Sequence, residues 1–379
     1  MGIFFDMLHG KEVSRAPVMA KIWLDLAARL LERRDWPTLF RDPALSASTV
    51  VEAAILAEND CSRLFLFAPR DIRPAENGYL HWRDGRPLGG VDADGGAATL
   101  LSSNDDFDMT DPATVIHYNA YKCPAPLMNT VEDVERLRIP TLEEYEALFG
   151  KAVETCRELA EGRLDLAGDC GSGTMAFCIS MNGMAKALMD IYDEPELLHA
   201  MMRKGAELCL QTARFLISKG IRILRYNDSA ANMMVISPDT WREFIKPNLA
   251  HFCREVHGIC PEARVYCHIC GDVRPILVDL IETGVDCIAP LDPMGGCSIE
   301  EIRALVGDSV MLMGGVNTMS FLNRTPQELA EETARCVRAG LRNGGRYAVG
   351  SGCAVPGGAS LESLLAISRA AAGISREML

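Results

Sequence analysis

Two short segments of the sequence combine side chains that bind zinc. In the segment Tyr266–Gly271, His268 and Cys270 stand two residues apart near the end of a predicted strand, so both side chains point to one face. Cys353 follows another predicted strand further along the chain. One imidazole and two thiolates suit Zn²⁺ and leave a fourth position open for chemistry. The spacing therefore predicts a catalytic zinc site made of His268, Cys270 and Cys353.

The same segment allows other interpretations. Cys267 and Cys270 form a C-x-x-C pair, but a redox pair opens a helix after the strand, whereas here the predicted strand runs through both residues. Attachment of a c-type haem fails because Gly271 stands where that motif needs histidine. Burial as ordinary core residues stays open for all of them. Cys170, Cys178 and Cys267 are reserve ligands, for which burial in the core is the better expectation.

The elements that must position these residues alternate in type along the chain. Short aliphatic segments are followed by longer segments with helical spacing. Capping boxes such as Thr141 with Glu144 mark helix starts, and Ser237-Pro238 marks another. Parallel strands joined by helices predict one α/β domain over residues 1–379, a closed (β/α)8 TIM barrel, with an open doubly wound sheet as the alternative. The predicted strands are 17–23, 63–68, 163–169, 221–227, 263–270, 286–291, 310–315 and 346–350.

Residues 70–118 interrupt this alternation, and a helical extension is expected at the N-terminus. The segment Gly78–Leu88 predicts a β-hairpin around an Asp84-Gly85 turn, inserted after the second barrel strand. The stretch Asp92–Asp111 is rich in Gly, Ser, Asn and Asp, which predicts a mobile loop. We expect the hairpin and this loop to gate the carboxyl end of the barrel.

Further candidate residues end other predicted strands, where barrel enzymes build their sites. Asp169 and Asp228 are candidate catalytic acids, able to bond substrate, accept a proton or serve as a fourth metal ligand. An equal alternative is that each only caps the helix that follows. Tyr226, Asn227 and Asn317 are the candidate substrate-binding residues.

The overall charge and the cysteines restrict the partners and the compartment. With 52 acidic against 38 basic residues the formal net charge is -14, which argues against a nucleic-acid partner. The first residues lack the order of a signal peptide, and no apolar run reaches membrane-spanning length. Fourteen cysteines without an export signal predict reduced thiols in the cytoplasm.

His268-x-Cys270 with Cys353 far downstream resembles the H-x-C...C zinc signature of corrinoid-dependent methyltransferases in the uroporphyrinogen decarboxylase superfamily, such as methylcobalamin:coenzyme M methyltransferases. The segment Ile236–Pro247 is similar to that superfamily's S-P-x-x-F-x-x-F-x-x-P segment, and the resemblance covers most of residues 160–370. It implies a TIM barrel, a zinc ion and transfer of a methyl group between a corrinoid and a small thiol, methyl ether or methylated amine.

The departures from the superfamily pattern limit what the resemblance implies. The chain has no D-x-H-x-x-G segment of the kind that ligates cobalt, so methylcobalamin or another corrinoid is expected on a partner protein. Around Arg15–Trp23 it lacks the R-Q-A-G-R-Y segment that meets porphyrin carboxylates, so porphyrin decarboxylation is not expected. Other partners would be the small methyl donor or acceptor, and a homodimer is one candidate assembly. The alternatives are a zinc-independent lyase of decarboxylase type acting on another carboxylate, and a non-catalytic binding barrel.

Overall fold

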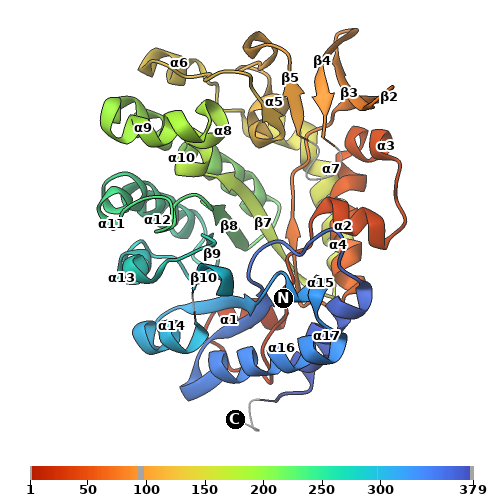
Figure 1. The fold of residues 1–379 in the computed structure, drawn as a ribbon, viewed down its shortest axis with the longest axis vertical. Coiled ribbons are helices and arrows are strands. Elements are labelled where there is room, and N and C mark those ends of the chain that lie inside the picture. Colours follow the sequence, from red (N-terminus) through yellow and green to blue (C-terminus); the bar gives the residue numbers. More distant parts are fainter. Residues whose placement is uncertain (1, 93–97, 297, 376–379) are drawn as a thin grey trace.

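A computed structural model describes residues 2–92, 98–296 and 298–375 and places seven parallel strands in one curled sheet (Figure 1). Their order in the sheet follows their order in the chain, as expected when each strand returns through a crossover helix. Aliphatic residues on both faces explain why these strands are almost fully buried. The strands are β1 (Cys61–Leu64), β7 (Asp165–Ser172), β8 (Ile223–Asn227), β9 (Arg264–His268), β10 (Cys287–Leu291), β11 (Met311–Val316) and β12 (Tyr347–Ser351).

The predicted first strand, residues 17–23, is shorter than expected. Only Val18 forms a bridge, a parallel one to Val349 of β12. The Met19 amide donates to the Val349 carbonyl at 2.9 Å, and the Asp60 amide donates to the Val18 carbonyl at 2.8 Å. Pro17 has no amide hydrogen to extend the ladder. The segment still joins both edges of the seven-stranded sheet, so the α/β fold is barrel-like, in agreement with the prediction.

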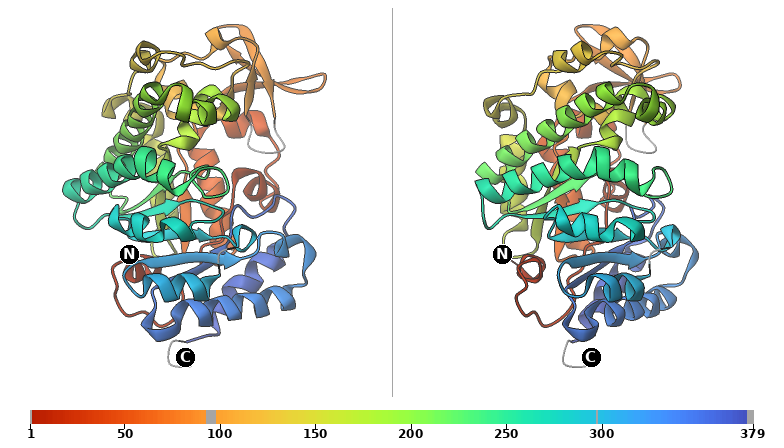
Figure 2. Two further views of the ribbon diagram at one scale, coloured as in Figure 1. Left: turned by 60° about the vertical axis from the view of Figure 1, so that its left-hand side comes forward. Right: turned by 90° about the vertical axis from the view of Figure 1, so that its left-hand side faces the viewer.

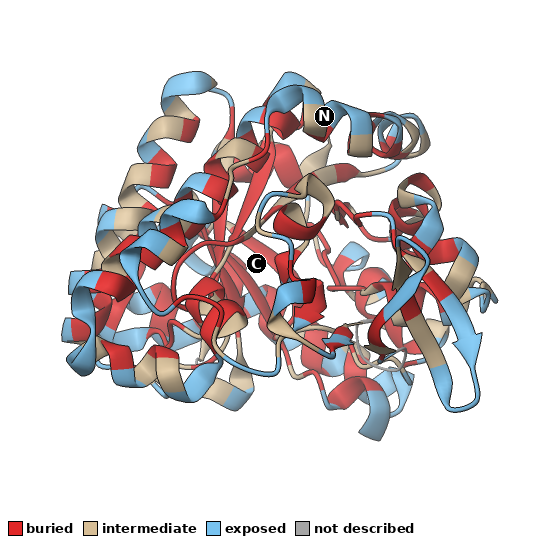
Figure 3. Cartoon of the chain, turned by 90° about the horizontal axis from the view of Figure 1, so that it is seen from above, coloured by how far each residue is buried: buried red, intermediate tan, exposed pale blue. Residues whose placement is uncertain are grey.

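Helices pack around the outside of the sheet (Figure 2), and their exposed faces ring the buried strands (Figure 3). The predicted caps are present: Thr141 and Glu144 form a complete capping box, and Ser237 accepts from the Thr240 amide. The longer helices are α4 (Pro43–Leu56), α7 (Leu142–Ala160), α8 (Met175–Asn182), α9 (Met184–Asp193), α10 (Pro195–Ser218), α12 (Lys246–Ile259), α14 (Ile299–Val306), α16 (Pro326–Leu341) and α17 (Leu361–Ala372).

The first residues do form a helical extension. The short helix α1 (Ile3–Leu8) is tied to the barrel because the Gly2 and Phe5 amides donate to the Asp165 carboxylate at 2.7 and 2.9 Å. No helix in the described ranges combines the length and apolarity needed to cross a membrane. The remaining short helices are α2 (Leu24–Leu30), α3 (Trp36–Arg41), α5 (Pro112–Ile116), α6 (Val131–Arg136), α11 (Pro238–Thr240), α13 (Leu277–Glu282) and α15 (Ser320–Asn323).

The insert after β1 is larger than the predicted hairpin. Strands β3 (Gly78–Arg83) and β4 (Arg86–Val91) form that hairpin, with Asp84 and Gly85 at positive φ in the turn. Three more strands complete a separate five-stranded sheet at the top of Figure 1: β2 (Asp71–Ala75), β5 (Thr99–Leu101) and β6 (Tyr121–Lys122).

The predicted mobile loop 92–111 is therefore corrected over its described part. Residues 93–97 lie outside the described residues, but β5 pairs with β4 through Gly89 and Leu101. A Cβ atom at Gly89 would come within 1.8 Å of the Leu100 carbonyl oxygen, so only glycine permits this approach. Strand pairing between distant residues is what the local composition of the loop could not reveal.

Candidate metal centre

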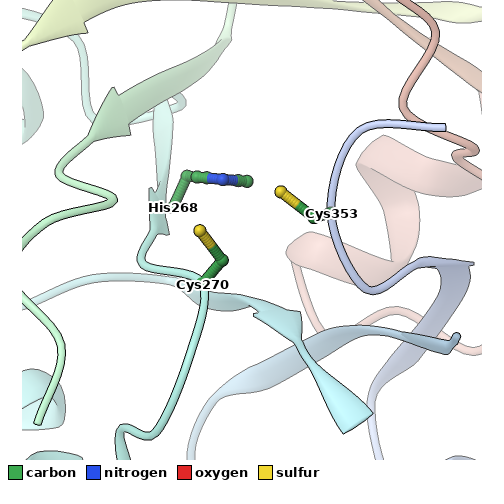
Figure 4. A group of neighbouring side chains, drawn as sticks. All are labelled: His268, Cys270 and Cys353. Carbon is green, nitrogen blue, oxygen red and sulfur yellow. The ribbon is translucent and has the colours of Figure 1, made fainter. Parts of the chain in front are cut away.

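The three predicted metal ligands meet at the carboxyl end of the barrel (Figure 4). His268 is the last residue of β9, Cys270 lies in the turn beyond it, and Cys353 lies in the loop after β12. Their candidate ligand atoms all lie within 4.8 Å of one another. The strand ends before Cys270, so the shared-face argument was wrong in detail: Gly271, at φ +97°, belongs to the turn that follows the strand. Among the described residues this is the one such group of three or more His, Cys, Asp or Glu side chains.

The two thiols of the centre share one hydrogen bond and do not titrate alike. The hydrogen bond from Cys270 lowers the pKa of Cys353, and the nearby Lys21 ammonium lowers it further against the effect of burial. The pKa of Cys270 is raised, because losing its proton would break that hydrogen bond and place a second negative charge beside the first. Without a metal ion the pair therefore favours a single thiolate, on Cys353.

Lys21 is a buried amine at this centre that the sequence analysis did not single out, and burial, followed by the Arg225 and Arg63 charges, holds its pKa well below the usual range. Its Nζ lies 2.9 Å from Nε2 of His268. Burial, followed by the Lys21, Arg225 and Arg63 charges, holds the pKa of His268 well below its usual range, so the imidazole is neutral and able to coordinate. Coordination of a metal ion through Nε2 of His268 requires Lys21 Nζ to move away from that nitrogen. A lysine inside the apolar segment Val18–Trp23 was the available signal.

Asp169 lies beside the centre, held between two buried guanidinium groups. It accepts from Nη2 of Arg63, and Arg225 Nη1 donates to both of its oxygens at 3.1 and 3.0 Å. Burial alone would raise the pKa of Asp169, but Arg225 and Arg63 outweigh it and hold that pKa at about 2. The carboxylate lines the cavity described below, yet its lone pairs are largely engaged. The signal for these arginines was a charged residue inside each of two apolar strands.

Of the other four candidate residues, Asn227 lines the cavity described below, and Tyr226, Asn317 and Asp228 do not. Asn227 lines the cavity, accepts from Arg225 Nη2 at 2.5 Å and donates to Ser172 Oγ at 2.7 Å. Tyr226 is fully buried and packs against Phe252 at 4.8 Å between ring centroids. Asn317 accepts from the Met319 amide at 2.9 Å, so it caps a turn.

Asp228 is fully buried and holds the start of helix α8. Its carboxylate accepts from the amides of Met175 and Ala176 at 3.2 and 2.8 Å and from the Thr174 hydroxyl. Burial raises the pKa of Asp228 to about 7, partly opposed by these amides. The sequence analysis left open that Asp228 caps the helix that follows it, whereas the helix it holds, α8, precedes it in the chain. The reserve ligands Cys170, Cys178 and Cys267 are also buried, and none joins the three-residue group.

A cavity of about 510 Å³ opens above the centre. It lies at the carboxyl ends of the strands, where barrels build ligand sites. His268, Cys270 and Cys353 line its floor together with Asp169, and residues of the insert, including His117 and Lys122, line its wall. The described part of the insert therefore borders the cavity that it was expected to gate.

The chain belongs to the uroporphyrinogen decarboxylase (URO-D) family, whose model matches residues 116–373. The methylated-thiol–coenzyme M methyltransferase of Methanosarcina mazei is 28% identical over 179 residues, covering 47% of this chain and 45% of that protein. The uroporphyrinogen decarboxylase of Chlorobium luteolum is 25% identical over 259 residues, covering 66% of this chain and 70% of that protein. The family thus includes relatives with two different activities, and the chain spans about half the length of the first of them.

A solved structure agrees with the fold. A methyltransferase from Methanosarcina mazei superposes with a TM-score of 0.66 at 18% identity, and the match covers 97% of each chain. At this identity the likeness concerns the arrangement of the barrel. The predicted superfamily and the α/β barrel-like fold are therefore confirmed.

Proposed function

We propose that the chain is a zinc-dependent methyltransferase. It moves a methyl group between a corrinoid, carried by a partner protein, and a small thiol, methyl ether or methylated amine. The observation that carries this proposal is the convergence of His268, Cys270 and Cys353 within 4.8 Å at the floor of a cavity. Relatives named as methyltransferases for coenzyme M support it.

The donor set fits zinc by its chemistry. One neutral imidazole and two cysteine sulfurs form a borderline-soft set of three, which leaves a position for substrate. A metal ion at this point would place positive charge beside the thiolate of Cys353 and would take the place of Lys21 at Nε2 of His268. When bound, zinc would supply Lewis acidity, either lowering the pKa of a substrate thiol or polarising the heteroatom of a methylated substrate.

The protein's own residues would position the substrate and exclude water. Asn227 is fixed by its bonds to Arg225 and Ser172, and its amide has a second N–H to offer to a ligand in the cavity. Asp169 holds Arg225 in place for this purpose. We assign Asp228 a positioning role, because it secures helix α8 and does not line the cavity.

The transfer itself exchanges one bond for another. When the methyl group moves from substrate to corrinoid, the bond between the methyl carbon and the substrate heteroatom breaks. The heteroatom keeps the electron pair of that bond and takes a proton. The reduced corrinoid supplies the pair for the new bond to carbon. In the opposite direction a substrate thiolate supplies the pair and the corrinoid is released in its reduced form. We propose that the partner docks over the carboxyl end of the barrel, beside the insert.

An absorbance assay tests this proposal. Zinc-loaded protein is mixed with methylcobalamin and a panel of thiols, and in reverse with reduced cobalamin and methyl ethers, thioethers or methylamines. We expect the methylcobalamin spectrum to change with at least one substrate, and Cys353→Ala to abolish the change. A spectrum unchanged in both directions across the panel would overturn the proposal.

A second candidate is a zinc-independent lyase acting on a carboxylate. Relatives named as uroporphyrinogen decarboxylases favour it, as does the cation cluster of Lys21, Arg63 and Arg225 at the cavity floor. This cluster also corrects the premise that the chain lacks cations for an acidic substrate. Metal content separates the two candidates: methyl transfer requires about one zinc per chain, whereas the lyase retains full activity after zinc is removed.

A further inference from the structure

One wall of the cavity consists of aromatic rings that the metal chemistry does not use. Trp23 and Phe65 lie 5.4 Å apart between ring centroids, and Phe65 and Phe67 lie 5.2 Å apart. Phe65 and Phe67 follow β1 two residues apart. The stacked pair Trp36 and Phe40 lines the same cavity. Such a row of rings suits a flat apolar ligand.

The aromatic wall adjoins the cation cluster. The Arg63 guanidinium lies over the Phe65 ring at 3.8 Å and over the Trp23 ring at 5.0 Å. Lys21 Nζ lies 5.7 Å from the centre of the Trp23 ring and 2.9 Å from Nε2 of His268. Trp23 therefore lies near both Arg63 and the lysine that contacts His268, and it lines the same cavity as the metal centre.

The buried charges of this region do not cancel. Lys21, Arg63 and Arg225 are 9%, 3% and 3% exposed, and Asp169 is the carboxylate that pairs with the two arginines. Nε and Nη1 of Arg63 and Nε of Arg225 have no hydrogen-bond partner in the described structure. Three other charged residues line the cavity. Asp25 is half-buried, and Asp92 and Lys122 are exposed and of opposite charge.

Zinc would not change this excess. A dication bound by two thiolates is neutral, so the guanidinium groups of Arg63 and Arg225 with the carboxylate of Asp169 would leave one positive charge at the cavity floor. A substrate that places one acid group near the two arginines would neutralise this charge. The cavity is thus complementary to a ligand with an acid group as well as a flat apolar body.

We propose that the cavity binds an aryl carboxylate, with its ring against Trp23, Phe65 and Phe67 and its acid group beside Arg63 and Arg225. The claim that this ring carries a methyl ether or thioether rests on the proposed function. The claim that the cavity binds an aryl acid rests on the cavity lining alone. The substrate class would then be methylated aromatic acids.

Binding to the zinc-loaded protein tests this without any methyl transfer. Benzoate, benzamide and cyclohexanecarboxylate are titrated by calorimetry, with tryptophan fluorescence as a second signal. We expect saturable binding of benzoate, at least about tenfold weaker binding of the uncharged benzamide, and about threefold to tenfold weaker binding of cyclohexanecarboxylate. Benzoate that binds no more tightly than either comparison ligand would overturn the proposal.

Two variants assign the binding to the residues named. Arg63→Gln is expected to weaken benzoate at least about tenfold and to leave benzamide unchanged. Its matched control is Arg73→Gln, because Arg73 also stacks on an aromatic ring, Trp82 at 4.6 Å, and pairs with an aspartate, but outside the cavity. Phe67→Leu is expected to weaken benzoate and spare cyclohexanecarboxylate, which keeps the test open if Arg63→Gln does not fold.

The outcome is independent of the methyl-transfer assay. Benzoate binding without any transfer would support the aryl acid site and remove the proposed function. Transfer to or from small aliphatic substrates without benzoate binding would do the reverse. Equal benzoate affinity in the Arg63→Gln and Arg73→Gln proteins would remove the assignment of the acid group to this cluster.

Discussion

Lys21 Nζ lies 2.9 Å from Nε2 of His268, which places a buried amine against a nitrogen that a metal ion would need. The contact joins the segment that closes the barrel to the end of β9. Burial, followed by the Arg225 and Arg63 charges, holds the pKa of Lys21 well below its usual range, so the group that faces Nε2 is favoured as a neutral amine. Metal and lysine therefore compete for the same position.

Replacing Lys21 by methionine should tighten zinc binding. The substitution removes the amine that contacts Nε2 of His268 and leaves that nitrogen free to coordinate, so we expect affinity to rise at least about tenfold. Competition with a chromophoric chelator measures this. Lys122→Met, which removes an exposed lysine from the cavity wall, serves as control and should not change the affinity. Equal affinities for the two variants would contradict the competition.

The position of a cysteine should decide whether its loss releases zinc. We expect Cys353→Ala to reduce zinc content from about one ion per chain to near zero. Cys178→Ala, at a buried cysteine on helix α8, should retain the metal. Elemental analysis of the two purified proteins makes the comparison, and zinc retained by the Cys353→Ala protein would place the site elsewhere.

Neutralising Asp169 should destabilise the fold. Asp169→Asn leaves the buried guanidinium groups of Arg63 and Arg225 without their shared carboxylate, which costs about 3 kcal/mol or more of unfolding free energy. Denaturant titration measures the loss. Asp239→Asn, at a side chain 94% exposed in an ion pair with Arg242, should cost under about 0.5 kcal/mol. A loss at Asp169 as small as that at Asp239 would mean that the arginines need no counterion.

Asp228 should make the fold less stable as pH rises. Its pKa is about 7 in the folded protein and near 3.8 when exposed, so the folded state holds a proton that the unfolded state has lost. The corresponding contribution is complete below about pH 4 and decreases between about pH 4 and 7, by up to about 4 kcal/mol. Unfolding free energies of the wild-type and Asp228→Asn proteins across this range measure it. If the two proteins show parallel pH profiles, Asp228 is ionised in the fold.

The barrel and its helices were predictable because their signals are local. Capping pairs such as Thr141 with Glu144 and the aliphatic segments around each strand depend on neighbours in the chain. The five-stranded insert was not predictable to this extent, because β5 is held by distant pairing with β4. The first strand was predicted too long for a similar reason, because Val18 contacts β12 and β1 without forming a regular ladder.

Part of the candidate site was visible in the same way. His268 and Cys270 stand two residues apart in the sequence, and Cys353 follows a predicted strand. The cations were not visible as a group, because Lys21, Arg63 and Arg225 come from three separate segments that only barrel closure brings together. Asp228 could not be told from a catalytic acid, since a helix cap and a site residue occupy the same kind of position.

X-ray absorption at the zinc edge tests the central claim most directly. If His268, Cys270 and Cys353 form the proposed centre, the purified protein should show two sulfur ligands at about 2.3 Å and one imidazole nitrogen at about 2.0–2.1 Å, with a further light atom in the open position. The Cys353→Ala protein, reloaded with zinc, should show no such shell. A zinc shell of nitrogen and oxygen alone, or a wild-type protein that takes up no zinc, would contradict the account.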